Sequence, residues 1–224
     1  MELTREEEKS LNGEHGESLQ IAYRILSAVG EATDAEKLVP IHWAHVSGVN
    51  YNTIGDAGEE FLANLSKNAK FKVRTTVNPM GYDKDSVEKF GLDENFIQKQ
   101  ESIRKSYAKM GMTPSLSCIP YEIYDLPRED THVSFAESNA AIYANSIGHL
   151  KTNKESAFSA LASAIIGKSP YSDLRKDDSP SMSISMKVQD PNELTFGLLG
   201  YFAGKVADKS VAISGVKNLD KRCN

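Results

Sequence analysis

The sequence predicts an α/β fold with a layered, mainly parallel sheet, and two observations support this prediction. Segments with helical periodicity and segments with strand-like alternation follow one another along the whole chain, which is the pattern of layered α/β domains. Several predicted strands also end in polar or thiol groups, at residues 47–50, Asn78, Cys118 and residues 137–139. Because ligands gather at the carboxyl ends of parallel strands, these four places are expected to share one site at an edge of the sheet.

The predicted helices carry recognisable start and stop signals. Thr4-Arg5-Glu6-Glu7 fits a capping box and opens a short helix that Gly13 ends. A long amphipathic helix is expected over residues 94–110, with Gly111 just beyond its last turn. Ser138 and Asn139 are expected to cap a further helix. Other helices are expected over residues 19–29, 58–68, 155–166 and 195–206.

Strands are expected where apolar residues alternate or cluster between turn signals. They cover residues 38–46, with an early break at Pro40, and residues 71–77, 114–119, 132–136 and 211–213. Residues 169–183 are rich in Ser, Asp, Lys and Pro and are expected to form a loop.

Two histidines, His42 and His45, suggest a metal site in the first predicted strand. Residues three apart in a strand point to opposite faces of the sheet. This spacing argues against chelation of one metal ion by the pair.

Composition and charge exclude several classes of protein. The chain has 224 residues, of which 40% are hydrophobic and 25% charged, and its net charge is −5, so no basic field favours nucleic acid or acidic lipid. The charged start excludes a signal peptide, and no apolar run reaches membrane-spanning length. The two cysteines, Cys118 and Cys223, do not define a disulfide framework, which leaves Cys118 as a free thiol, a metal ligand or a small core residue. A cytoplasmic protein without a nucleic acid or membrane partner is therefore expected.

Residues 137–146 concentrate carboxylate, hydroxyl and amide groups among small apolar residues. If Ser138 and Asn139 begin a helix, the free backbone N–H groups of its first turn would face these side chains and favour an anionic ligand. The alternative is that the same groups only cap the helix and bond to its neighbours, because Ser and Asn favour caps for structural reasons. Composition alone leaves both interpretations open.

Motifs spread over nearly the whole chain resemble, in the same order, those of the large chain of the aconitase X family. The matching segments are Leu3-Thr4, Glu6-Glu7-Glu8, Leu11-Asn12-Gly13-Glu14, Gly16-Glu17, Ala44-His45-Val46-Ser47-Gly48-Val49, Ile54-Gly55-Asp56-Ala57-Gly58, Thr75-Thr76-Val77-Asn78-Pro79-Met80-Gly81, Cys118-Ile119-Pro120-Tyr121, residues 137–146 and Thr152-Asn153. The resemblance implies an aconitase-like domain and a hydro-lyase of the aconitase superfamily.

The resemblance also implies a reaction. Bacterial members dehydrate cis-3-hydroxy-L-proline, and the archaeal enzyme dehydrates (R)-5-phosphomevalonate to trans-anhydromevalonate 5-phosphate in the mevalonate pathway of isoprenoid biosynthesis. Such a dehydration needs a base for the α-proton and a Lewis acid for the departing hydroxyl. The family site is built around an iron–sulfur cluster, expected to be of the 4Fe–4S type, and one of its cysteine ligands matches Cys118.

The same resemblance assigns site residues one by one. Ser47, Glu137 and Ser138 are expected to be catalytic, and Ser47 and Glu137 are the alternative candidates for the base. The other matches are expected to bind substrate, because their donors could hold its carboxylate and stabilise developing charge: Gly48, Val49, Asn50, Asn78, Pro79, Asn139, Asn145, Ser146, Thr152 and Asn153.

Two further features concern partners and completeness. The chain begins at the large-chain motif without a fused swivelling domain, which resembles the two-subunit archaeal enzymes, favours phosphomevalonate and implies a small swivelling-domain subunit as partner. The chain is also shorter than the family's large subunit, Leu116 stands where a cysteine is common, and Cys223 is the other thiol. Residues 1–224 are therefore expected to be the N-terminal part of a catalytic domain. The alternative is a truncated, non-catalytic fragment that binds a metabolite or assists assembly.

Overall fold

A computed structural model describes most of the chain. It covers residues 1–83, 85, 87–176, 180, 182–189, 191–207 and 211–217. The chain divides into two compact units, Met1–Lys176 and Asp177–Asn224, and each is described by itself. Cys223 lies outside the described residues. Within the described ranges, no helix combines the length and the apolar character needed to cross a membrane.

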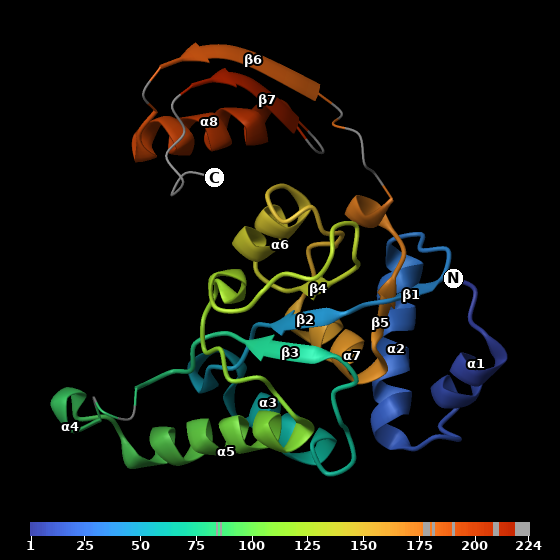
Figure 1. The fold of residues 1–224 in the computed structure, drawn as a ribbon. Helices are drawn as coiled ribbons and strands as arrows, with labels where there is room; N and C mark the ends of the chain where they lie inside the picture. The colour runs from blue at the N-terminus through green and yellow to red at the C-terminus, as the bar shows by residue number, and fades with distance from the viewer. Residues whose placement is uncertain are drawn as a thin grey trace. The chain divides into compact units, whose positions relative to one another are not determined.

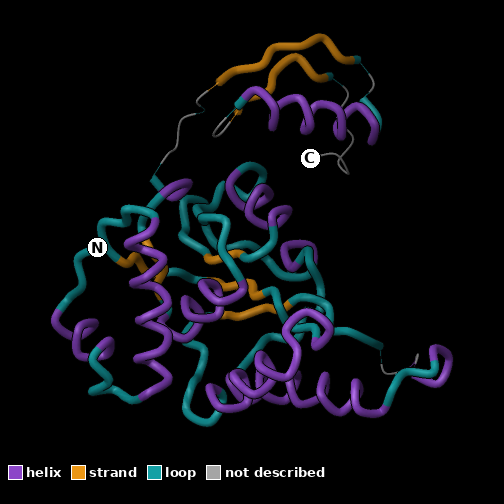
Figure 2. Tube along the Cα trace, turned by 180° about the vertical axis from the view of Figure 1, so that it is seen from behind, coloured by secondary structure: helices purple, strands orange, loops and turns teal. Residues whose placement is uncertain are grey.

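The first unit builds helices around a three-stranded parallel sheet (Figures 1 and 2). Strand β2 (Trp43–Val46) lies between β3 (Arg74–Val77) and β4 (Ser134–Phe135), and both neighbours run parallel to it. A separate antiparallel pair joins β1 (Leu38–Pro40) to β5 (Lys168–Pro170). The helices of this unit are α1 (Arg5–Leu11), α2 (Glu17–Ala32), α3 (Tyr51–Leu65), α4 (Val87–Phe90), α5 (Glu94–Met110), α6 (Ser138–Asn145) and α7 (Ala157–Ile166), with 3-10 turns at Pro120–Glu122 and Asp173–Arg175. The predicted α/β class with a mainly parallel sheet is confirmed.

Helices bury the central strand of this sheet. All four residues of β2 are buried. Helix α7 packs on β2 and β4, α2 packs on α7, and α3 packs on α5. Every residue of α7 from Ser159 to Ile166 is buried, and the Ala and Ser side chains in this segment allow the helix to lie close to its neighbours.

The predicted helix ends are largely confirmed. Thr4 and Glu7 form the capping box of α1. Gly111 ends α5 with φ of 100°, and Gly167 ends α7 with φ of 76°, a left-handed conformation that glycine adopts without a steric penalty. Ser156 caps α7, so this helix begins later than predicted.

Helix α3 begins earlier than the predicted start at residue 58. Asn50 precedes it, and the Asn50 side chain accepts a hydrogen bond from the backbone N–H of Asn52 at 2.9 Å. This contact caps the first turn. Gly55, with φ of 60° and ψ of −165°, interrupts the helix. The predicted polar turn over residues 47–53 is therefore partly helical.

The strand predicted over residues 38–46 is two strands in different sheets. Pro40 is the last residue of β1, and the chain enters the central sheet at Trp43. The break expected at Pro40 is thus confirmed. The strand before it, β1, pairs with β5, and the strand after it, β2, pairs with β3 and β4.

The strand predicted over residues 114–119 is wrong, because this segment is a loop. Leu116 has a positive φ of 45°, which an extended strand does not allow. The loop nevertheless lies beside β3: the Ser115 hydroxyl donates to the Val77 carbonyl at 2.8 Å, and the Ser117 N–H donates to the same carbonyl at 3.2 Å. Cys118 consequently lies in a loop and not in a strand.

The second unit is a β-α-β arrangement of β6 (Met182–Val188), α8 (Glu193–Val206) and β7 (Val211–Val216), with β6 and β7 parallel. Helix α8 and the start of β7 agree with the prediction. The loop expected over residues 169–183 is wrong at both ends, where β5 and the first residues of β6 lie. Ile184, Met186 and Val188 alternate with polar residues in β6, a strand signal that the sequence analysis missed.

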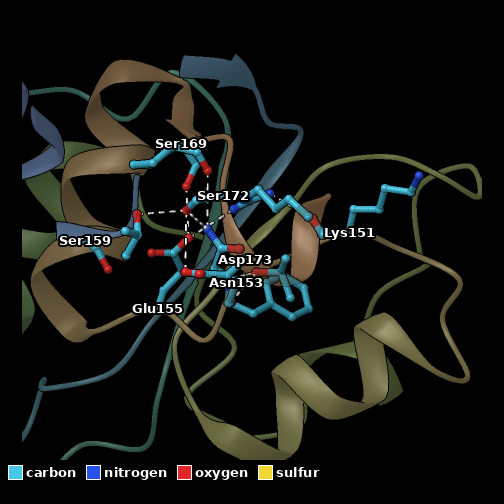
Figure 3. A network of polar contacts seen from close by, with 12 residues as sticks. Lys151, Asn153, Glu155, Ser159, Ser169, Ser172 and Asp173 are labelled. Atoms are coloured by element: carbon cyan, nitrogen blue, oxygen red, sulfur yellow. Dashed lines mark hydrogen bonds and ion pairs between the residues drawn. The ribbon is translucent and has the colours of Figure 1, made fainter. Parts of the chain in front are cut away.

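A buried ion pair lies near the end of the first unit. Arg175 is 1% exposed, and its Nη2 lies 3.0 Å from Oε1 of Glu155. Its Nη1 donates to the carbonyl of Lys151 at 2.8 Å, and the Ser169 hydroxyl donates to the same Glu155 oxygen at 2.9 Å (Figure 3). A buried charge is tolerated when it is paired and hydrogen-bonded. Arg175 joins the 3-10 turn Asp173–Arg175 to the segment that precedes α7, and Glu155 joins that segment to β5 through Ser169.

Loss of the Arg175 guanidinium should destabilise the chain strongly. Arg175→Ala leaves the buried Glu155 carboxylate without its counter-ion, and the expected loss is about 3–5 kcal/mol of unfolding free energy. The matched control is Arg104→Ala, which breaks the more exposed Arg104–Glu101 pair and should cost about 1 kcal/mol or less. Urea unfolding measures both variants, and equal losses would contradict the structural role of Arg175.

Candidate functional site

The three strands of the central sheet deliver polar residues to one edge. Ser47 directly follows β2 and Asn78 directly follows β3, while Glu137 lies two residues after β4. Pairing continues past the strands, because the Asn78 N–H donates to the Val46 carbonyl at 3.1 Å and the Ala136 N–H donates to the His45 carbonyl at 2.9 Å. The predicted edge at the carboxyl ends of the strands therefore exists and gathers these groups.

A side-chain hydrogen bond links two of these strand ends. The Asn78 amide nitrogen donates to Oε1 of Glu137. Glu137 has φ of 88°, an unusual backbone conformation for a residue other than glycine, and such strain clusters at functional sites. The Glu137 carboxylate thus has a fixed partner and a fixed direction.

The start of α6 differs from the predicted cap. The N-cap residue is Glu137, and its side chain makes no capping hydrogen bond, because the carboxylate binds Asn78 instead. Ser138 and Asn139 are the first helical residues and are exposed. The prediction that this pair caps the helix is wrong by one residue.

Cys118 lies close to this helix start. The Asn139 side chain donates to the Cys118 carbonyl at 3.1 Å, which holds the loop against α6. Burial and the negative charge of Glu137 raise the pKa of the Cys118 thiol. The half-buried thiol is therefore predominantly protonated near neutral pH in the absence of a bound cation.

A buried histidine, His45, lies in β2 just before the edge of the sheet where the candidate site residues gather. His45 is fully buried, and its Nδ1 lies 2.9 Å from the Thr76 hydroxyl, which also accepts a hydrogen bond from the Trp43 indole N–H at 2.9 Å. Burial lowers the pKa of His45 to about 4, although the nearby Asn78 side chain and Thr76 backbone act in the opposite direction, so the ring is neutral at pH 7. His42 is exposed, consistent with the predicted opposite faces.

Ser47 and Gly48 line an apolar pocket of about 450 Å³ between α3 and α7. Gly48 has φ of 73°, and a Cβ atom there would lie 2.9 Å from the Ala157 methyl group, so glycine is required for two reasons. Val49 is buried, and its carbonyl accepts a hydrogen bond from the Gln100 amide at 2.8 Å. The sequence predicted this turn as a binding loop, and Val49 and Asn50 shape its backbone.

The remaining predicted substrate residues have other surroundings. Asn145 and Thr152 bond reciprocally, at 2.8 Å and 2.9 Å, and Thr152 is fully buried. Asn153 donates to the Ser172 hydroxyl at 3.3 Å, within the network of Figure 3. Ser146, at the far end of α6, donates to the carbonyl of Ile142 in its own helix, and Pro79 is exposed. Their assignment as substrate residues stays a prediction.

The described residues do not fit an iron–sulfur cluster on their own. Across the described ranges, no group of three or more His, Cys, Asp or Glu side chains could hold a metal ion, and Cys118 is the free cysteine found there. Cluster binding commonly uses about four protein ligands. One thiol supplies a single ligand.

The unfolding free energy should fall as the pH falls from about 6.5 to about 4. Folded His45 has a pKa of about 4, whereas its ordinary value is 6.5, so the unfolded state binds more protons in this range. The expected slope is up to about 1.4 kcal/mol per pH unit. Urea unfolding at several pH values should show a smaller slope for His45→Gln and an unchanged slope for His42→Gln. If His45→Gln keeps the full slope, the buried neutral ring is not its origin.

A family model described as "Aconitase X first domain" matches residues 1–177. The phosphomevalonate dehydratase large subunit of Methanocaldococcus jannaschii is 41% identical to this chain over 219 residues, which cover 94% of this chain and 54% of the relative. The cis-3-hydroxy-L-proline dehydratase of Hypocrea jecorina is 30% identical, over 95% of this chain and 36% of the relative.

The crystal structure of Thermococcus kodakaraensis aconitase X in its holo-form has the same fold, with a TM-score of 0.84 and 38% identity over 98% of this chain and 55% of that chain. This chain spans about half the length of the phosphomevalonate dehydratase subunits that it matches. With a family match that extends over most of its residues, the chain belongs to the aconitase X family.

Proposed function

We propose that this chain is part of the large subunit of a phosphomevalonate dehydratase, a hydro-lyase that converts (R)-5-phosphomevalonate to trans-anhydromevalonate 5-phosphate in the mevalonate pathway. The observation that carries the proposal is the Glu137 carboxylate, which Asn78 holds at the common edge of three parallel strands. Identity favours this substrate, since the M. jannaschii dehydratase subunit is 41% identical and the H. jecorina hydroxyproline enzyme is 30% identical.

In the proposed reaction, Glu137 is the base that removes the α-proton. A carboxylate with one oxygen fixed by Asn78 presents the other in a defined direction, as proton abstraction requires. Ser47 lies at the same edge and is the alternative base, as well as a donor to the substrate carboxylate.

The start of α6 is suited to the negative groups of the substrate. Ser138 and Asn139 are exposed in the first turn of this helix, where backbone N–H groups and the helix dipole favour anions. We assign these two side chains to binding of the substrate carboxylate, whose charge increases during α-proton removal.

Cys118 is proposed as one ligand of an iron–sulfur cluster, and no reaction step is assigned to that cluster. Its remaining ligands would have to come from residues outside the described part of the chain, because the described part supplies one thiol.

A small subunit with a swivelling domain is the proposed partner, because the relatives are named large subunits. The complete enzyme would consist of the large and small subunits, and its other binding partner would be the small-molecule substrate. We also propose a cytoplasmic location for the complete enzyme, as the composition of the chain led us to expect.

Replacement of Glu137 by Gln should lower kcat of the complete enzyme, assembled with its small subunit, by about 10²–10⁴-fold, because the amide cannot accept the α-proton. Ser47→Ala tests the alternative base in the same assay of water elimination from (R)-5-phosphomevalonate. The control is Glu122→Gln, which changes an exposed carboxylate in a nearby turn. If Glu137→Gln and Ser47→Ala both turn over at the rate of the parent enzyme, the assignment of the base is wrong. Turnover of cis-3-hydroxy-L-proline in place of phosphomevalonate would instead identify the alternative substrate.

The chain of residues 1–224 by itself should contain little iron after anaerobic purification, because its described residues offer one thiol ligand. In the complete enzyme, Cys118→Ser should lower bound iron, acid-labile sulfide and visible absorption, whereas Ser117→Ala should leave them unchanged. A full complement of iron in the Cys118→Ser enzyme would show that Cys118 is not a ligand.

A further inference from the structure

A row of buried polar groups leads across β2 and β3 to Glu137. The Trp43 indole N–H donates to the Thr76 hydroxyl at 2.9 Å, and this hydroxyl lies 2.9 Å from Nδ1 of His45. Asn78, two residues after Thr76, donates through its amide nitrogen to the Glu137 carboxylate. Trp43, His45 and Thr76 are almost completely buried, so none of the three can contact a substrate.

The next link in this row would join His45 to Asn78. Nε2 of His45 and Oδ1 of Asn78 are both buried and, among the described residues, neither has a hydrogen-bond partner of good geometry. The register of β2 and β3 pairs His45 with Thr76, and Asn78 follows Thr76 by two residues, which places its side chain on the same face of the sheet as His45. A potential donor and an acceptor, both buried and without a partner among the described residues, therefore lie on the same face of two neighbouring strands.

The Glu137 carboxylate, which can only accept hydrogen bonds, determines the donor and acceptor roles of Asn78 and His45. Glu137 accepts hydrogen bonds, so the NH₂ group of Asn78 must face it, and Oδ1 of Asn78 is left to accept a hydrogen bond on its other side. A neutral imidazole has one donor and one acceptor nitrogen. With the proton on Nε2, Nδ1 accepts the proton of the Thr76 hydroxyl at 2.9 Å, in preference to the Ala44 carbonyl, which lies 3.4 Å from the same hydroxyl. The opposite tautomer would place the Nε2 lone pair against the oxygen of Asn78.

We propose that His45 is a positioning residue: its Nε2–H fixes the amide of Asn78, and through that amide the direction of the Glu137 carboxylate. The proposal deepens the function proposed above and rests on it for the role of Glu137. Thr76 sets the tautomer of the ring, and Trp43 in turn occupies the hydroxyl oxygen of Thr76. The low pKa of His45 agrees with a ring that remains neutral at pH 7.

The first test is independent of any activity. Nitrogen NMR of the histidine-labelled chain at pH 7 should show the His45 ring, assigned through His45→Gln, as the neutral Nε2–H tautomer. Thr76→Val removes the hydroxyl donor and should shift the Nδ1 resonance. Thr75→Val is the matched control, because Thr75 is an equally buried neighbour whose hydroxyl donates to the Val73 carbonyl at 3.0 Å. An Nδ1–H tautomer or a cationic ring would overturn the proposed row of donors.

The second test measures turnover of the complete enzyme. His45→Leu removes the donor to Asn78 and should lower kcat by about 10–100-fold, by analogy with the residues that orient metal ligands, with KM within about twofold. His45→Gln retains an amide donor near the position of Nε2 and should recover at least about half of the lost activity on a logarithmic scale. Circular dichroism establishes that both variants are folded.

The outcomes separate the two proposals. If the parent enzyme fails to dehydrate phosphomevalonate but its ring is the Nε2–H tautomer, the proposed substrate is wrong and the row of donors stands. If the parent enzyme is active and folded His45→Leu has the same kcat, the positioning role is wrong whatever the tautomer. A fall of kcat in His45→Leu with recovery in His45→Gln is the result we expect.

Discussion

The parallel pairing of β2 with both β3 and β4 is the constraint on which the candidate site depends. The three strands run in one direction, and the register places Val46 opposite Val77 and His45 opposite Phe135. Residues that follow the strands therefore meet at one edge, although Asn78 and Glu137 are 59 positions apart in the sequence. A shift of one register position would turn every side chain of β2 to the opposite face and would remove His45 from Thr76.

Buried polar groups make this register specific in a way that apolar packing does not. An unpaired buried donor or acceptor costs about 1–3 kcal/mol, so Trp43, His45 and Thr76 stabilise the alignment in which all three are bonded. Arg175 and Glu155 act in the same way between the 3-10 turn Asp173–Arg175 and the segment before α7. The fold therefore uses hydrogen-bond geometry to fix the same backbone segments that carry the candidate site residues.

The sequence correctly predicted those helix ends that depend on contacts between residues close together in the chain. The capping box of Thr4 and Glu7 and the terminal glycine Gly111 depend on residues within one or two turns, and both are confirmed. The strand predicted around Cys118 failed because Leu116 adopts a left-handed conformation, which its side chain type does not signal. Contacts with β3 through Ser115 hold that conformation in the folded chain.

For the candidate site, the sequence predicted which strand ends lie at the same edge of the sheet, but not the contacts that each side chain makes there. The rule that parallel strands end at one edge was enough to bring Asn78 and Glu137 together. Residue type alone did not distinguish Asn145, whose amide bonds to the backbone of Thr152, from Asn78, whose amide bonds to a carboxylate. The role of His45 was missed because its partner Thr76 belongs to another strand, and the alternation of β2 shows which face His45 occupies but not what it meets there.

The two chemical requirements of the proposed dehydration are unequally represented in the described residues. For proton transfer, the described residues offer Glu137 as the candidate base, Asn78 as its hydrogen-bond partner and the buried His45 as the proposed positioning residue. The metal requirement has one thiol, Cys118, whose pKa burial and Glu137 both raise. A nearby positive charge would reverse that effect, since it stabilises the thiolate and offsets the carboxylate. The Glu137 carboxylate, which the proposed reaction uses as its base, therefore also influences the ionisation of the one thiol that the described residues offer to a metal.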